Sequence, residues 1–99
     1  MHVTSAKPLW AFATKHADAK IPLRAWLKLA EQGTFRNLTE LKKTFKSVDM
    51  VPVKQRDFYV FNIGGNKYRL VAAIHFNTQM LYVRHVLTHA EYSAGGWKQ

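Results

Sequence analysis

Two cationic side chains share one face of a strand-like segment, YRLVAAIHF at residues 68–76. Alternate residues of a strand point to the same side, so Arg69 lies with His75 on one face, whereas the opposite face is purely apolar. Arg84, in the next strand-like segment, falls on the Arg69 face when a short hairpin joins the two strands. Guanidinium groups match phosphate geometry, and a fixed positive charge stabilises the negative charge that develops in phosphoryl transfer. The spacing predicts a phosphate-binding basin or, in the plainer interpretation, merely exposed strand arginines.

A second group of reactive side chains lies in the tail segment LTHAEYSAGGW. Thr88 and Glu91 have the spacing of a capping box, which predicts a short helix from His89 to near Gly95. Glu91 is then engaged by backbone amides and is a poor catalytic base. His89 and Tyr92 take no part in the capping box. Beside the arginines they could transfer protons in a metal-free RNA cleavage, in which the 2′-hydroxyl attacks the adjacent phosphate. Alternatively, both side chains simply pack the tail.

The elements that hold these residues follow from hydrophobic spacing. Strands are expected at residues 2–5, around MVPV, and at 58–63, 67–76 and 80–87. The last three form an antiparallel meander, joined by GGN and NTQ, with glycines that allow a tight turn. Helices are expected after Ser5 as a cap, over IPLRAWLKLAEQG up to Gly33, and as a short third turn in NLTELKKTFKS.

These elements predict one α+β domain over residues 1–99, with two or three N-terminal helices on one face of a small antiparallel sheet. With two-residue loops, Val60 faces Arg69 and Ala73 faces Arg84. The core face then carries His85 with a set of apolar residues, to be covered by Trp10, Trp26 and Leu27. The basic face carries Asn62, Lys67, Arg69, His75, Tyr82 and Arg84 around Val71, Ala73 and Val86. The role of His75 is left open.

The overall charge also points to a polyanionic partner. Fifteen Lys and Arg against six Asp and Glu give a net charge of +9, whose field attracts nucleic acid. Lys20, Arg24 and Lys28 recur at every fourth residue of the second helix. This basic ridge either contacts an RNA backbone or is an ordinary solvated face.

Several classes of chemistry lack their residues. The chain has no cysteine, its five histidines show no zinc spacing, its acids are scattered, and no phosphate-binding glycine motif is present. The expected activity therefore requires no metal ion and no cofactor. The N-terminus lacks the apolar core of a signal peptide and no apolar run approaches transmembrane length, so a cytoplasmic protein without a membrane partner is expected.

The segments YVFNIGGNKYRLVAAIHF and LYVRHVLTHAEY resemble the HigB family of toxins, within the RelE-like superfamily of bacterial toxin–antitoxin systems. The resemblance is specific over residues 58–92, where N-[IV]-G-G-N-x-x-R and T-H-x-E-Y stand intact; the helical half is similar only in layout and charge. It implies a microbial RNase-like fold and a ribosome-dependent endoribonuclease that cuts mRNA in the decoding site. It also implies a tightly bound HigA-type antitoxin in a toxin–antitoxin hetero-oligomer.

The resemblance also implies roles for individual residues. Arg69 matches the central-strand arginine that contacts the scissile phosphate, and Arg84 stands where a second arginine serves as phosphate clamp or general acid. Tyr92 matches the C-terminal tyrosine that stacks on a base and takes part in proton transfer. His89 would stand beside the 2′-hydroxyl or the phosphate, and Lys67 would help to hold the RNA backbone.

Two other classes of function compete with this one. A non-catalytic RNA-binding or ribosome-associated protein would use the same basic face only to dock on phosphates, and its affinity would fall evenly with salt. A DNA-binding regulator is disfavoured because no helix-turn-helix pattern is evident.

Overall fold

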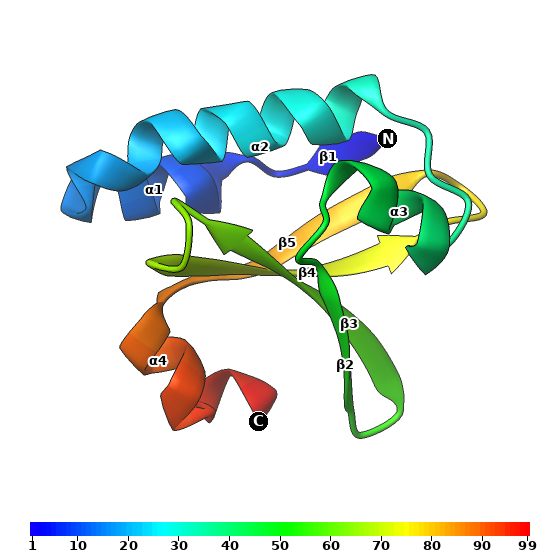
Figure 1. The fold of residues 1–99 in the computed structure, drawn as a ribbon. Helices are drawn as coiled ribbons and strands as arrows, with labels where there is room; N and C mark the ends of the chain where they lie inside the picture. Colours follow the sequence, from blue (N-terminus) through cyan, green and yellow to red (C-terminus); the bar gives the residue numbers. More distant parts are fainter.

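A five-stranded mixed sheet forms the centre of the computed structural model, which describes residues 1–99 (Figure 1). The strands are β1 (His2–Thr4), β2 (Asp49–Val53), β3 (Arg56–Ile63), β4 (Tyr68–His75) and β5 (Met80–Thr88). Their order is β1-β5-β4-β3-β2, with β1 parallel to β5 and all other pairs antiparallel. The predicted meander is confirmed as β3–β4–β5, but the expectation of an antiparallel sheet is wrong at β1. Three α-helices, one 3₁₀ helix and three strands separate β1 from β5, a crossover long enough for parallel pairing.

The helices lie on both sides of the sheet. The N-terminal ones are α1 (Lys7–Lys15), the short 3₁₀ helix η1 (Ala17–Ala19), α2 (Lys20–Gln32) and α3 (Leu38–Thr44). They cover one face, as predicted, whereas α4 (His89–Ala94) and the 3₁₀ helix η2 (Gly96–Lys98) lie across the other (Figure 1). The capping box that starts α4 is confirmed, since Thr88 and Glu91 exchange both bonds. None of the helices is long and apolar enough to cross a membrane.

The main core lies between the N-terminal helices and the sheet. Alternate residues of the central strands face it as predicted, and Phe61, Leu70 and Leu81 are almost completely buried. Trp26 of α2 is buried against the ring of Phe61, with centroids 5.3 Å apart and the rings nearly perpendicular, a favourable aromatic contact. This apolar face fixes which side of the sheet remains available for a ligand.

The first helix departs from its prediction in two ways. It begins at Lys7 after Ala6, and Ser5, expected as its cap, instead has φ of 58° and makes no capping bond. Leu9 and Ala13 are the residues that α1 buries. Trp10 is 37% exposed and does not cover the core, because its position is turned by about 100° from Leu9 around the helix.

Both hairpin loops contain four residues rather than the predicted two. The turns are residues 64–67 and 76–79. As a result Arg69 pairs with Asn62, and Ala73 pairs with Tyr82. The two glycines of the first turn have φ of 62° and 68°, a backbone region in which glycine carries no steric cost. Two extra loop residues preserve the face of each strand side chain, because the strand period is two.

A β-bulge in β5 sets the positions of Arg84 and His85. Ala72 pairs with Val83 but Val71 pairs with His85, so β5 has one more residue than β4 at this point. Arg84 is that additional residue. Beyond a bulge the side chains change face.

The bulge overturns two placements that strict alternation predicts. His85 pairs with Val71 on the sheet face opposite the N-terminal helices, so it does not lie in the core. Val86 instead pairs with Leu70 and packs against the main core, not on the basic face.

The side chain of Gln79 ties the second hairpin turn to the loop after α2. Its Nε2 donates to the carbonyl oxygens of Phe35 (2.6 Å) and Phe76 (2.8 Å), and its Oε1 accepts from the Phe35 amide at 3.1 Å. The loop after α2 therefore depends on a side chain far away in the sequence.

We expect Gln79→Ala to lower the free energy of unfolding by about 2 kcal/mol, because it removes three partly buried hydrogen bonds. Alanine keeps a Cβ, so the left-handed backbone of residue 79 (φ 57°) is equally strained in both proteins. Urea unfolding measures the difference. Gln55→Ala, at an exposed residue of another turn, is the control and should change stability by less than about 0.5 kcal/mol. Equal stability of the two variants would contradict this account.

Candidate active-site groove

Two adjoining hollows lie on the sheet face that the N-terminal helices leave open. Their volumes are about 500 and 630 Å³, and both are lined by Arg56, Phe58 and Arg84. The first is further lined by Asp57, Tyr59, Ala73, Ile74, His75 and Tyr82, and the second by Val53, Lys54, Gln55, His85, Trp97, Lys98 and Gln99. We call the two together the sheet groove. Its second hollow lies between the β2–β3 hairpin and the C-terminal residues 97–99.

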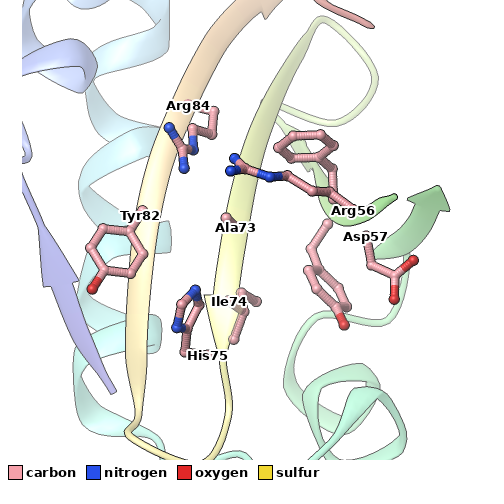
Figure 2. Close-up of a pocket in the computed structure, with 9 residues that line it drawn as sticks. Arg56, Asp57, Ala73, Ile74, His75, Tyr82 and Arg84 are labelled. Atoms are coloured by element: carbon pink, nitrogen blue, oxygen red, sulfur yellow. The ribbon is translucent and has the colours of Figure 1, made fainter. Parts of the chain in front are cut away.

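Two arginines converge at the middle of the sheet groove. Figure 2 shows the guanidinium groups of Arg56 and Arg84 directed toward each other across β4, above the small side chain of Ala73, while Asp57 points away. Neither arginine forms an ion pair, since the one salt bridge in the structure joins Lys67 and Asp18. Like charges that face each other without a counter-ion repel. An anion bound between them would remove that repulsion.

Local structure explains the position of each arginine. Arg56 starts β3 directly after the Lys54–Gln55 turn and pairs with Val53; Lys54 has φ of 58° in that turn. Arg84 is the bulged residue of β5, and bulges commonly re-aim a side chain. The two guanidinium groups therefore come from different hairpins and meet only in the folded sheet.

Histidines lie on both sides of the arginine pair. His75 contacts the Tyr82 ring edge-on, with centroids 5.4 Å apart, in the first hollow. His85 lines the second hollow. Burial lowers the pKa of His85 below 6.5, and the charge of Arg84 lowers it further. A neutral imidazole at pH 7 can accept a proton.

Arg69 lies on the same face of the sheet as Arg84, but it is covered and lines neither hollow of the groove. It is 9% exposed, and its guanidinium group donates to the carbonyl oxygens of Asn66 and Tyr68 and to the side chain of Asn66. The ring of Tyr92 lies 5.6 Å from its Cζ. No carboxylate pairs with it, although buried charges in proteins are normally paired. Three bonds leave two of its five N–H donors for a further acceptor.

The C-terminal 3₁₀ helix η2 lines the second hollow of the sheet groove through the ring of Trp97. Trp97 is buried in a small second core with Val60 and Val71, on the open face of the sheet. Its ring stacks on Tyr92 at 5.3 Å, and its Nε1 donates to the Tyr92 carbonyl. Lys98 lies 5.6 Å from the Trp97 ring. This packing places one more cation at the groove.

The sequence-predicted site residues do not all meet. Arg69 and Tyr92 lie together and Arg84 lies in the sheet groove. His89 is exposed at the start of α4, and its backbone amide donates to the Lys67 carbonyl. Lys67 itself is held by Asp18 at 2.7 Å, an exposed pair that lowers the pKa of Asp18 and raises that of Lys67.

The basic ridge of α2 lies away from the groove. Lys20, Arg24 and Lys28 are all exposed on the helical side of the molecule. None of them lines the sheet groove.

The sequence patterns do not indicate several of the groove residues. They give no role to Arg56, Lys54 or Lys98, and strict alternation predicts the wrong face for His85. The alternating run VPVKQRDFYV, with a two-residue turn at its centre, was the available signal for the hairpin that carries Arg56. Nothing in the sequence marks the bulge that re-aims Arg84 and His85. No group of three or more histidine or acidic side chains is close enough together to hold a metal ion.

A small, strongly basic α+β domain with an arginine-lined groove has the character of the RelE-like toxic components of toxin–antitoxin systems. Residues 19–95 match the family model described as the HigB toxin, RelE-like toxic component of a toxin-antitoxin system, and the chain belongs to this family. It is 38% identical to the mRNA interferase toxin HigB of Escherichia coli (strain K12) and to the mRNA interferase HigB of Shigella flexneri. It is 28% identical to the mRNA interferase HigB of Escherichia coli O6:H1. Each alignment covers 93% of this chain and 88% of the relative. The toxic component of such a system has an antitoxin as its partner.

Proposed function

We propose that this toxin is an mRNA interferase that cleaves translated mRNA on the ribosome and thereby inhibits translation. The observation that carries the proposal is the pair of uncompensated guanidinium groups of Arg56 and Arg84 in the sheet groove. The names of the relatives, which are mRNA interferases at up to 38% identity, support it. Its RelE-like fold, its cytoplasmic location with the ribosome and its hetero-oligomeric complex with a HigA-type antitoxin belong to the same proposal.

The proposed reaction uses the 2′-hydroxyl group of the RNA. This oxygen attacks the adjacent phosphorus, the new 2′-O–P bond forms, and the P–O5′ bond breaks. A base takes the proton from the 2′-hydroxyl, and an acid gives one to the leaving 5′-oxygen. Arg56 and Arg84 bind the phosphate and stabilise the additional negative charge of the transition state. The products are a 2′,3′-cyclic phosphate and a 5′-hydroxyl end, and these steps require no metal ion.

The two groove histidines are the proton-transfer residues that the geometry favours. His85 and His75 lie on either side of the arginine pair, the arrangement that an in-line displacement requires of its base and acid. His85, with its lowered pKa, suits the base. The spacing in the tail instead predicts proton transfer by His89 or Tyr92, and the resemblance implies Arg84 as phosphate clamp or general acid.

Residues outside the arginine pair have a part in holding the RNA. Arg69 has two free donors for a neighbouring phosphate, and Tyr92 offers a ring on which a base can stack. Lys67 can join them, because its ion pair with Asp18 is exposed to solvent and therefore weak. The ridge of Lys20, Arg24 and Lys28 would contact a separate RNA segment, since it lies away from the groove.

The direct test compares a translated mRNA on purified ribosomes with the same mRNA free in solution. We expect cleavage on the ribosome, with 2′,3′-cyclic phosphate ends, and no cleavage at a site that carries a 2′-deoxynucleotide. Cleavage of free mRNA at the same rate would show that the reaction does not require the ribosome. A folded protein that binds RNA without cutting it would overturn the enzyme and leave a basic RNA-binding module, whose affinity falls with salt.

The pH dependence tests His85 as the base. Only the neutral imidazole accepts a proton, so the cleavage rate should rise with pH, with a midpoint below 6.5, and then level off. NMR titration of the His85 ring should give the same midpoint. In Arg84→Gln that midpoint should move upward, because one of the two causes of the lowered pKa is gone.

Lys28→Gln removes a charge on the helical side of the molecule and should leave the His85 midpoint in place. His85→Gln should lower the plateau rate more than His89→Gln does. A rate that falls as pH rises through this range would contradict the assignment of His85 as the base.

A further inference from the structure

One edge of β5 has no partner strand over most of its length. β1 pairs only with Met80–Tyr82, because Thr4 is its last residue and Ser5 turns the chain toward α1. The order of the sheet places no other strand on that side. Val83–Thr88 therefore present outward backbone N–H and C=O groups without a neighbouring strand, as edge strands do.

A hollow of about 410 Å³ lies beside this free edge, between β5, α1 and the first turn of α4. Its walls include Ala11 and Lys15 of α1, Val86 and Leu87 of β5, and Glu91 of α4. Six strand residues extend over about 20 Å. The edge and its hollow can thus receive an extended segment of several residues, which would add a strand to the sheet.

The chemistry of the hollow selects for acidic and apolar side chains. Lys15 and Arg84 line it, and neither is paired with a carboxylate. The one acid, Glu91, already accepts a hydrogen bond from the Thr88 amide at 2.8 Å. Half-buried Phe12 adds an apolar surface to the same lining. An extended segment that alternates carboxylates with apolar residues complements this lining.

We propose that an extended, acidic and apolar segment of the antitoxin adds as a strand to the free edge of β5, between α1 and α4. The existence of an antitoxin follows from the family. Arg84 and His85 line both this hollow and the sheet groove. A carboxylate of the bound segment would pair with Arg84 and withdraw it from the phosphate, so docking at the edge silences cleavage. Only this consequence rests on the proposed function.

Two variants of α1 test the docking by calorimetric titration with the purified antitoxin of the same toxin–antitoxin pair. Ala11→Trp fills the hollow from an exposed helix position, and Lys15→Glu reverses a charge of its lining. We expect each to weaken antitoxin binding at least tenfold and to leave cleavage by the free toxin unchanged. Lys43→Glu makes the same charge change on the exposed surface of α3 and should bind like the wild type.

Hydrogen exchange in the wild-type toxin locates the bound segment. This measurement depends neither on cleavage activity nor on the correct folding of a variant. In the wild-type toxin, the outward amides of residues 84–87 should exchange fast when free and become protected in the complex. Wild-type affinity in both variants, or protection confined to other surfaces such as α2, would overturn the proposal. So would protection of this edge by an RNA oligonucleotide and not by the antitoxin. If the toxin proved unable to cleave RNA, the proposed function would be wrong, but the binding measurements would still test the docking of the antitoxin.

Discussion

Arg84→Ala and Arg56→Ala should each lower the cleavage rate of translated mRNA by about 100-fold or more, which is the usual effect of removing one preorganised donor to a transition-state anion. The two guanidinium groups converge across β4 without a counter-ion, so each substitution removes half of the proposed phosphate site. Both side chains are exposed, and their loss should change the unfolding free energy by less than about 0.5 kcal/mol. The measurement is single-turnover cleavage on purified ribosomes, with circular dichroism to confirm folding.

Arg36→Ala is the matched control for this pair. Arg36 is an exposed arginine before α3, it lines neither hollow of the sheet groove, and its loss lowers the net charge by the same amount. Wild-type rates for Arg36→Ala beside slow cleavage by the groove variants would show that position and not total charge matters. If all three variants lost activity equally, the basic surface would act only as a general RNA attractant. Wild-type rates for both groove variants would exclude the arginine pair as the phosphate site.

Arg69→Met should lower cleavage by about 100-fold, while it leaves the unfolding free energy unchanged or raises it. Arg69 donates three hydrogen bonds, but as a buried cation without a carboxylate partner it also carries an uncompensated desolvation cost that offsets them. Replacement of buried charged groups by apolar side chains of similar volume is often neutral or stabilising. The structure shows such a cation, 9% exposed under Tyr92 and held by neutral oxygen acceptors. Residues retained for activity at a cost in stability are typical of functional sites.

Thermal unfolding and single-turnover cleavage of the same Arg69→Met preparation make the comparison. Val71→Ala, two residues along β4 on the same face and fully buried, provides the opposite control, with a loss of stability of about 1 kcal/mol or more and little change in chemistry. A large loss of stability in Arg69→Met would show that Arg69 mainly holds the Asn66 turn. If both cleavage and stability were unchanged, Arg69 would have no role in binding the RNA.

The sequence alone determined most of the secondary structure and the two faces of the sheet. The period of two in β3 and β4, the capping box at Thr88 and the glycines of the first hairpin are local signals, and each predicted the presence of its element, although the hairpin loop is two residues longer than predicted. Local signals persist in the fold because alternation, capping and positive φ depend on residues close together in the chain. They also placed Arg69 and Arg84 on one side of the sheet.

Only the tertiary structure decided how the reactive side chains are grouped. The bulge moved His85 from the core to the groove, the β2–β3 hairpin brought Arg56 to Arg84, and Tyr92 covered Arg69. Each of these depends on register or on packing between distant segments, and one additional residue in a strand changes the face of every side chain that follows. Local periodicity does not contain that information, so the sequence indicated the chemistry of the site and the fold selected which residues meet in it.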